Sequence, residues 1–491
     1  MTDNKNLTDR NAPWRAELRN KITAKERAVI PRAKMSQLDP AYRVKTLNEE
    51  VNCGLSTDQA VLEATRCLDC PTPTCMEGCP VSIEIPSFIK NIQRGRADLA
   101  AEVLRRTSAL PAVCGRVCPQ ERQCESRCIY HKMKKEPVAI GYLERYAADT
   151  ERSLRKMGLS AEPQPAVSND IRVAVAGSGP AGLSFAGEMA RRGFKVDVYE
   201  ALHEIGGVLK YGIPEFRLPN EVVDAELDSL RKAGVVFHAN TVIGKTLSYD
   251  DLLNEGFRGI FVASGAGLPR FMGIPGENLG GVMSSNEYLT RINLMGAGRP
   301  GYATPVAHGK RVAVVGGGNT AMDSVRTALR MGAEKAMIVY RRSEAEMPAR
   351  VEEVEHAKEE GVEFLTLCNP VEYLGDEKGR VRAMRVQRMT LGEPDASGRR
   401  KPVAIPGAID EIEIDEVIVS VGVSPNPLIP DNIDGLDVTE RGTISVNENL
   451  RSSLATVFAG GDIVRGGATV ILAMGDGRKA AASMAAQLLE E

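Results

Sequence analysis

The segment Arg172-Val-Ala-Val-Ala-Gly177-Ser-Gly179-Pro-Ala-Gly182 decides the fold of most of this chain. It joins a short β-branched run to a glycine-rich turn and an apolar helical pattern, as in a dinucleotide-binding βαβ unit. Gly177 would allow the tight turn, Gly179 the approach of a pyrophosphate, and Gly182 the close packing of helix on strand. The segment therefore predicts a pyrophosphate site at a helix N-terminus, where free amides and the helix dipole favour anions.

Three further features favour FAD as the dinucleotide. The next predicted strand, 195–199, ends at Glu200, where a carboxylate can accept hydrogen bonds from ribose hydroxyls. The pair Gly206-Gly207 follows closely, and Gly461-Asp462 lies near the C-terminus. In flavoproteins with two dinucleotide folds, such a Gly-Asp segment returns to the first fold, where the aspartate meets the ribityl chain. We therefore expect a discontinuous FAD domain into which the second fold is inserted.

A second glycine-rich loop follows the predicted strand 311–315 and reads Gly316-Gly-Gly318-Asn319-Thr320-Ala321, with alanine in place of the third glycine. The strand after it, 336–340, ends at Arg341-Arg342 instead of at an acid. A carboxylate there would repel a 2′-phosphate, whereas guanidinium groups bind phosphate through two parallel hydrogen bonds. This pattern favours NADPH over NADH, and the alternative is a pair of surface arginines at a strand end.

Nine of the ten cysteines lie between Cys53 and Cys128, and eight of these form two groups. The groups read Cys67-x₂-Cys70-x₄-Cys75-x₃-Cys79-Pro80 and Cys114-x₃-Cys118-Pro119-x₄-Cys124-x₃-Cys128. Thiolates at such short spacings, with a Cys-Pro ending, are typical of iron-sulfur proteins. Zinc is the main alternative, but zinc sites usually use two separated Cys-x₂-Cys pairs and this chain has one. No cysteine pair lies near the predicted flavin loop, so electrons would leave through the cysteine-rich region.

Size and composition are those of a soluble globular protein of two or three domains. The 491 residues exceed one hydrophobic core, and 43% hydrophobic with 26% charged residues is ordinary. A net charge of −3 argues against nucleic-acid binding, and the sequence has neither a membrane-length apolar run nor a secretory signal. We expect a cytoplasmic protein. The first fifty residues carry eleven Lys/Arg against seven Asp/Glu, which we interpret as a solvated arm on the body.

The pattern along the chain predicts an α-helical N-terminal domain followed by two tandem α/β Rossmann-like domains. Ser56 and Gln59 make a capping box before a helix, and helical patterns recur at 97–104 and 140–148. The stretch 161–167 is the clearest linker. We therefore expect a [4Fe-4S] domain at 1–155, an FAD domain at 168–295 and 416–491, and an NADPH domain at 296–415.

These motifs resemble a known family, and the resemblance covers nearly the whole chain. Cys67-Leu-Asp-Cys70, Cys114-Gly-Arg-Val-Cys118-Pro119 and Pro137-Val-Ala-Ile-Gly141, with both glycine loops, are similar to the small (β) subunit of bacterial NADPH-dependent glutamate synthase. The same module occurs in the large subunit of NADH-dependent ferredoxin:NADP oxidoreductase and in the N-terminal part of dihydropyrimidine dehydrogenase.

The resemblance implies two interlaced [4Fe-4S] clusters. Carried over by position, one cluster would be held by Cys67, Cys70, Cys75 and Cys128, and the other by Cys79, Cys118, Cys124 and Glu144. Cys114 and Cys53 would be spare thiols. For Glu144 the alternative is a salt bridge to Arg145 or another cation, since buried acids are usually paired.

The resemblance also implies a function. NADPH would reduce FAD, and electrons would pass through both clusters to a large catalytic glutamate synthase subunit, which this chain has no room to contain. No side chain is expected to act as a proton-transfer catalyst, since the cofactors carry the chemistry. The alternative is the ferredoxin:NADP oxidoreductase large subunit, whose partner is a ferredoxin-linked flavoprotein. A third, non-enzymatic possibility is a cluster-bearing scaffold.

Overall fold

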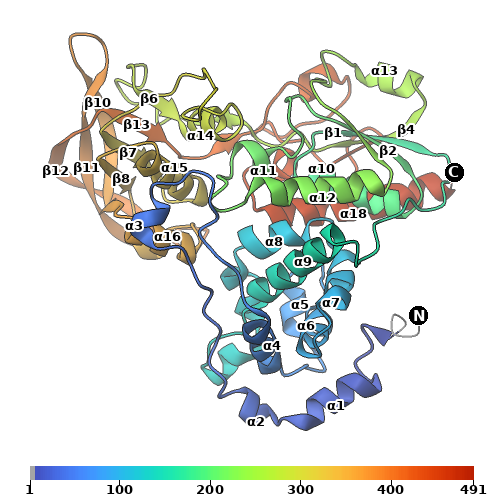
Figure 1. The fold of residues 1–491 in the computed structure, drawn as a ribbon. Coiled ribbons are helices and arrows are strands. Elements are labelled where there is room, and N and C mark those ends of the chain that lie inside the picture. The colour runs from blue at the N-terminus through green and yellow to red at the C-terminus, as the bar shows by residue number, and fades with distance from the viewer. Residues whose placement is uncertain (1–5, 491) are drawn as a thin grey trace.

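The computed structural model describes residues 6–490 and has three parts (Figure 1). A helical domain lies below two α/β units that stand side by side. Within residues 6–490, no helix is both long and apolar enough to cross a bilayer. The helical domain begins with α1 (Pro13–Lys21), α2 (Ala24–Arg27), α3 (Pro40–Arg43), α4 (Thr57–Arg66) and α5 (Thr74–Glu77). It continues with α6 (Ile85–Gln93), α7 (Ala97–Arg105), α8 (Pro111–Val117) and α9 (Ile140–Lys156).

Short 3-10 turns connect α8 to α9 and carry the second cysteine group. They span Gln120–Arg122, Glu125–Arg127 and Ile129–Met133. The predicted capping box at the start of α4 is confirmed. The Ser56 hydroxyl accepts from the Gln59 backbone amide, and the Gln59 side chain accepts from the Ser56 backbone amide. The helices predicted near 97 and 140 are confirmed as α7 and α9.

The first α/β unit is built on a parallel sheet of order β15-β4-β1-β2-β3. Its strands are β1 (Arg172–Ala176), β2 (Lys195–Tyr199), β3 (Val235–His238), β4 (Phe257–Val262) and β15 (Val457–Ala459). Its helices are α10 (Pro180–Arg191), α11 (Val208–Tyr211), α12 (Asn220–Lys232), α13 (Tyr249–Asn254), α17 (Asp462–Arg465) and α18 (Val470–Glu490). The chain thus returns at β15, after the whole second unit, to pair with β4.

The second unit has a parallel sheet of order β6-β13-β7-β8-β9. Its strands are β6 (Val282–Ser284), β7 (Arg311–Val315), β8 (Lys335–Tyr340), β9 (Glu363–Thr366) and β13 (Glu416–Val419). Its helices are α14 (Ser285–Asn293), α15 (Asn319–Arg330) and α16 (Val351–Glu359). The expected boundaries at 295 and 416 therefore differ from the sheets by one strand at each end. β6 and β13 belong to the second sheet, because β13 pairs in parallel with β7 and β6 pairs in parallel with β13.

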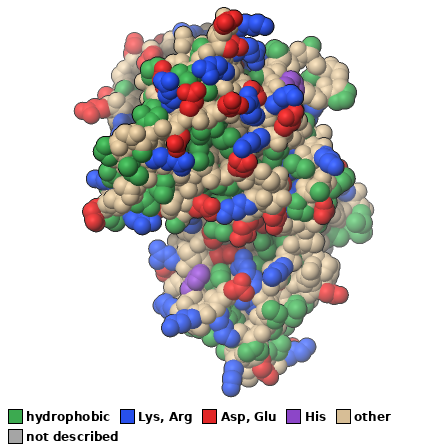
Figure 2. All heavy atoms as spheres, turned by 90° about the vertical axis from the view of Figure 1, so that its left-hand side faces the viewer, with side chains coloured by type: hydrophobic (Ala, Val, Ile, Leu, Met, Phe, Trp, Pro, Cys, Tyr) green, Lys and Arg blue, Asp and Glu red, His purple; other side chains and the backbone are tan. Residues whose placement is uncertain are grey.

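An antiparallel sheet extends the second unit outward. It consists of β10 (Cys368–Gly375), β11 (Val381–Pro394) and β12 (Arg400–Glu413). The two chain crossings between the units also pair with each other, as β5 (Leu268–Pro269) and β14 (Val423–Ser424). Figure 2 views the molecule from the side of the antiparallel sheet and shows positive and negative side chains interspersed with apolar ones. Arg385, for example, pairs with Glu372 at 2.8 Å and with Glu411 at 3.4 Å.

The N-terminal segment is tied into the molecule, so its interpretation as a solvated arm is wrong for its arginines. Arg15, Arg27 and Arg43 are buried. Arg15 and Arg19 both bind the buried carboxylate of Asp69, at 2.6 and 2.8 Å. Several arginines of the segment therefore form ion pairs with the body while its described lysines stay exposed, and the segment carries α3 across to the second unit beside α16 (Figure 1).

Candidate functional site

The glycines of the first loop occupy three different environments between β1 and α10. Gly177 has φ +109°, and a Cβ there would clash with the carbonyl of Ala263. A Cβ on Gly182 would clash with the carbonyl of Gly177, so helix and strand pack in direct contact. Gly179 precedes α10 without a side-chain cap and faces open space, with nothing within 4 Å of an added Cβ. The open side of Gly179 and the uncapped helix can therefore receive a pyrophosphate.

Glu200 lies at the end of β2, beside this loop, and holds it in shape. Its carboxylate accepts from the backbone and the hydroxyl of Ser178, at 3.0 and 2.5 Å, and from the Leu202 amide at 3.0 Å. The Ser178 hydroxyl in turn accepts from the amide of Gly206 at 2.9 Å. Gly207 has φ +55°, and a Cβ added to it would lie 2.8 Å from the Cα of Gly179. The loop therefore has no room for a side chain at position 207.

The C-terminal Gly-Asp segment lies against the same loop. A Cβ on Gly461 would lie 2.9 Å from the Cβ of Ala181 in α10. Asp462 begins α17, and burial raises its pKa to about 6. The structure therefore brings together every residue that the sequence predicted around the FAD loop.

The second loop repeats this geometry between β7 and α15. Gly316 has φ +147°, and a Cβ there would clash with the carbonyl of Ser420. Gly318 precedes α15 without a side-chain cap and has only Pro348 Cγ near an added Cβ, at 4.0 Å. Thr320 is exposed in the first turn, and Ala321 is fully buried where the third glycine would pack. Asn319 accepts from the amide of Arg350 at 2.9 Å.

The two arginines after β8 differ in their surroundings. Arg341 is exposed, and within residues 6–490 its guanidinium makes no hydrogen bond or ion pair. Arg342 is buried and donates to the carbonyl of Arg400 at 2.8 Å and to Asp395 at 2.6 Å. Arg342 therefore ties β8 to the antiparallel sheet, whereas Arg341 is available to a 2′-phosphate.

Four of the cysteines surround one cavity in the helical domain. The cavity has about 390 Å³ of empty space, is partly open to solvent, and is lined by Cys67, Cys70, Cys75 and Cys128. The cysteines surround this space instead of meeting at a point, and in residues 6–490 no three His, Cys, Asp or Glu side chains converge on a single metal ion. Burial raises the pKa of Cys70 to about 11 and that of Cys128 above its usual value, so thiolates there need a compensating cation.

The first cysteine loop is held by buried charges. Lys90 is fully buried and donates to the carbonyl of Cys67 at 2.6 Å, and its pKa falls to about 8, chiefly through burial. Asp69 lies between Cys67 and Cys70 with φ +53° and is held there by Arg15 and Arg19. The loop geometry therefore depends on the N-terminal helix α1.

The second group of predicted ligands shares one buried environment with Glu144. Burial raises the pKa of Cys79 to about 11 and that of Cys124 well above its usual value, and a nearby Glu144 charge adds to both effects. Glu144 itself is buried, and its Oε1 has no hydrogen-bond partner. Burial raises the pKa of Glu144 to about 8.

The expected alternative for Glu144, a salt bridge to Arg145, is wrong. Arg145 instead pairs with Glu50 at 3.0 Å and with Asp149 at 3.4 Å. Burying a carboxylate without a partner costs free energy. Coordination of a metal would give Glu144 such a partner. The four-cysteine cavity and this orphaned acid both fit the iron-sulfur centres that the cysteine spacing predicts.

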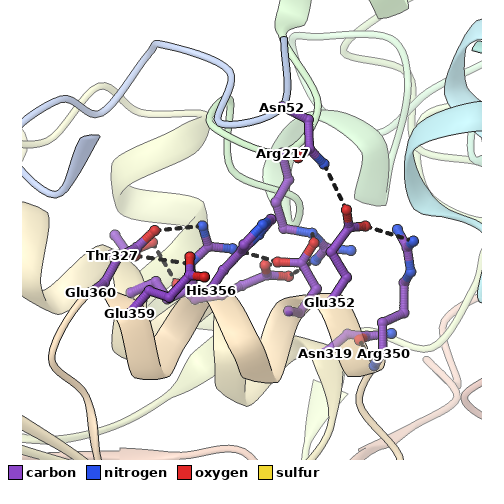
Figure 3. Close-up of polar contacts among 12 residues, drawn as sticks. Asn52, Arg217, Asn319, Thr327, Arg350, Glu352, His356, Glu359 and Glu360 are labelled. Atoms are coloured by element: carbon purple, nitrogen blue, oxygen red, sulfur yellow. Dashed lines mark hydrogen bonds and ion pairs between the residues drawn. The ribbon is translucent and has the colours of Figure 1, made fainter. Parts of the chain in front are cut away.

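A buried ion network at the base of the second unit could not be predicted from the sequence. Arg326, fully buried on α15, pairs with Glu353 and with Glu360 at 2.8 Å. Arg43 of the N-terminal segment reaches the same Glu360 at 2.8 Å, and Arg217 of the first unit reaches Asp323 at 2.6 Å. Figure 3 shows Glu360, His356 and Glu352 spread along α16, with Arg217 lying against the helix. No local motif marks these residues, because their partners are remote in sequence.

The fold and the site define an NADPH-dependent oxidoreductase in which a 4Fe-4S domain precedes two nucleotide-binding units. The model of dihydropyrimidine dehydrogenase domain II, 4Fe-4S cluster, matches residues 43–156, and that of pyridine nucleotide-disulphide oxidoreductase matches residues 171–477. The glutamate synthase [NADPH] small chain of Azospirillum brasilense is 38% identical over 455 residues, 91% of this chain and 93% of that one. The chain belongs to the pyridine nucleotide-disulphide oxidoreductases and, among them, to the glutamate synthase small-chain family.

Two other matches define how far the likeness extends. The NADP(+)-dependent formate dehydrogenase subunit beta of Moorella thermoacetica is 39% identical over 435 residues, which are 84% of this chain but 59% of that one. Mycobacterium tuberculosis FprA in complex with NADPH has a TM-score of 0.55 at 20% identity, covering 66% of this chain and 85% of that one. The second likeness concerns the fold alone.

Proposed function

We propose that this chain is the electron-input subunit of a larger enzyme. NADPH, FAD and two [4Fe-4S] clusters would carry electrons to a glutamate synthase large subunit that forms L-glutamate from L-glutamine and 2-oxoglutarate. The full-length similarity to glutamate synthase small chains supports this assignment. The first unit would hold FAD and the second NADPH, so the FAD domain would consist of two segments separated by the second unit.

One arrangement carries this proposal: α18 contacts both the segment after the predicted cluster ligand Cys79 and the helix that follows the first glycine loop. On one side, a Cβ on Gly475 would lie 3.0 Å from the carbonyl of Pro80, the residue after Cys79. On the other side, Gly477 packs directly on the backbone of Ala181 in α10. A helix is about 10 Å across. The predicted flavin site and the predicted cluster site therefore lie close enough to form one redox chain.

The residues of this chain would bind and orient the cofactors. The first cluster would be held by Cys67, Cys70, Cys75 and Cys128, and the second by Cys79, Cys118, Cys124 and Glu144. When bound, the flavin supplies the conversion of a two-electron donor into single electrons. Arg341 would bind the 2′-phosphate of NADPH, and the open sides of Gly179 and Gly318 would receive the two pyrophosphates.

A second candidate is the large subunit of NADH-dependent ferredoxin:NADP oxidoreductase, with a small ferredoxin-linked flavoprotein as its partner. This candidate is supported by the similarity to subunits of other enzymes. The formate dehydrogenase subunit beta is as similar to this chain as the glutamate synthase chains are. The partner therefore has to be decided by experiment.

The test is anaerobic purification of the native complex, with identification of the chains that co-elute. The purified chain is then mixed with each candidate partner. With a large amidotransferase chain, NADPH, glutamine and 2-oxoglutarate should yield glutamate, and omission of this chain should abolish NADPH-dependent formation. Activity restored only by a small flavin and [2Fe-2S] protein with ferredoxin would favour the second candidate. Absence of NADPH-dependent dye reduction by protein that contains FAD and iron would overturn both.

A further inference from the structure

The loop between Cys118 and Cys124 contacts the second unit, and Arg122 makes the largest set of these hydrogen bonds. Arg122 donates from Nη1 to the carbonyl of Pro348 at 2.8 Å. Its Nη2 donates to the carbonyls of Met347 and Ala349, at 2.9 and 3.0 Å. Three consecutive carbonyls are thus held by one guanidinium, whose planar fork of donors suits such a fixed arrangement.

The segment held by Arg122 forms one wall of the second glycine loop. The amide of Ala349 donates to the carbonyl of Gly317 at 3.1 Å. The amide of Arg350 donates to the side chain of Asn319 at 2.9 Å, and Asn319 is the first residue of α15. Figure 3 shows Asn319 directly beside Arg350. The position of 347–350 therefore fixes where the N-terminus of α15 presents its amides.

A second arginine joins the same two regions in the opposite direction. Arg350 is buried and donates to the carbonyl of Arg116 at 2.6 Å and to the Gln120 side chain at 3.1 Å. Gln120 in turn lies against Gly141, where a Cβ would clash with its amide group, at the start of the helix that carries Glu144. A continuous series of contacts therefore connects the second group of predicted ligands with the second glycine loop.

We propose that Arg122 is a positioning residue that couples the second cluster loop to NADP(H) binding. The inference rests on the proposed function, because it takes the second glycine loop as the NADP(H) site and Cys118 and Cys124 as cluster ligands. An ordered cluster loop holds 347–350 against the glycine loop, and a bound nucleotide holds the cluster loop in return. Such coupling between two sites is reciprocal by thermodynamic necessity.

The first test measures NADP⁺ binding to the oxidised holoprotein by calorimetry. Arg122→Ala should weaken NADP⁺ binding at least fivefold without loss of FAD or iron, because Arg122 is exposed and supports no core packing. Arg122→Lys should recover only part of the affinity, since an ammonium cannot hold three carbonyls in one plane. The matched control is Arg127→Ala, which removes an exposed positive charge from the adjacent segment between Cys124 and Cys128, where the described residues show no hydrogen bond or ion pair from Arg127 to the second unit.

The second test uses the reciprocal effect and does not depend on turnover. Iron release to a chelator is followed with and without saturating NADP⁺. NADP⁺ should slow iron release in the wild type and in Arg127→Ala, and should slow it clearly less in Arg122→Ala, in which the contacts of Arg350 remain. Unchanged NADP⁺ affinity in Arg122→Ala, or equal protection in both variants, would overturn the coupling. Failure of wild-type protein to bind NADP⁺ or iron would instead overturn the proposed function.

Discussion

The helical domain meets the two α/β units through interfaces of different chemistry. Towards the first unit it shares one continuous apolar core, in which Val113 and Leu143 belong with Phe185 and Met474. Towards the second unit it makes mainly hydrogen bonds and ion pairs, through Arg122, Arg350 and Arg43 at the end of α3. Apolar burial is non-directional and strong, whereas charged contacts fix geometry. The apolar interface therefore holds the helical domain and the first unit together, and the polar interface sets the orientation of the second unit.

The largest effect is expected when the contact between α18 and α10 is broken, because it lies within the apolar core that the first unit shares with the helical domain. Gly477→Val places side-chain atoms where the backbone of Ala181 and Phe185 already lies. It should abolish FAD binding and lower the iron content too, because one core serves both regions. FAD and iron per purified chain are the measurement. Ala486→Val, at an exposed position of α18, is the control and should retain both cofactors. Loss of FAD with full iron content would show that the two regions fold separately.

Breaking the ion network should destabilise the second unit alone. Arg326→Ala leaves the buried carboxylates of Glu353 and Glu360 without part of their compensation, a change that costs about 3–5 kcal/mol. Denaturant unfolding should show an earlier transition of the second unit, with FAD and iron retained. Arg291→Ala removes an exposed pair with Glu287 and should cost under about 1 kcal/mol. Equal effects of the two substitutions would contradict the role of the buried network.

Nucleotide preference should depend on Arg341 more than on Arg342. Arg341→Ala removes charge-assisted bonds worth about 1.5–3 kcal/mol, so the KM for NADPH should rise at least tenfold. Use of NADH should change little. Lys335→Ala, at the opposite end of β8, removes a charge from the same strand and serves as the control. Equal losses with NADPH and NADH would show that Arg341 has a structural role.

The smallest effect is expected at Glu144, the buried acid on α9 whose Oε1 has no hydrogen-bond partner. Glu144→Ala should leave FAD content intact and change the potential or occupancy of one cluster only. Electron paramagnetic resonance at controlled potential is the measurement. Glu151→Gln is the control on α9, since this acid already pairs with Arg105 at 2.6 Å. Unchanged spectra and potentials of both clusters in Glu144→Ala would exclude a ligand role.

The predictable parts of this molecule are those whose geometry is local. Gly177 and Gly182 are required by contacts within one strand-turn-helix segment, so the sequence pattern was sufficient to place them. The grouping of Cys128 with Cys67 around one cavity followed from the family resemblance, because the intervening chain of sixty residues carries no local signal for it.

The parts that could not be predicted depend on remote partners. Nothing near Arg43 indicates that it pairs with Glu360, and Arg341 and Arg342 look equivalent until the antiparallel sheet places Asp395 beside one of them. The expected domain boundaries differ from the limits of the sheets for the same reason. β6 and β13 are short apolar runs that would suit either sheet, and they join the second one because β13 pairs with β7 and β6 pairs with β13.

The pairing of β5 with β14 has a consequence for how such chains can be recombined. Leu268 lies opposite Ser424 and Pro269 opposite Val423, so the inserted unit enters and leaves the first unit at neighbouring points. A segment whose two ends meet can be exchanged as a cassette without stretching either junction. A nucleotide unit of different specificity could be grafted at this neck, provided that it brings a loop whose carbonyls match the guanidinium of Arg122.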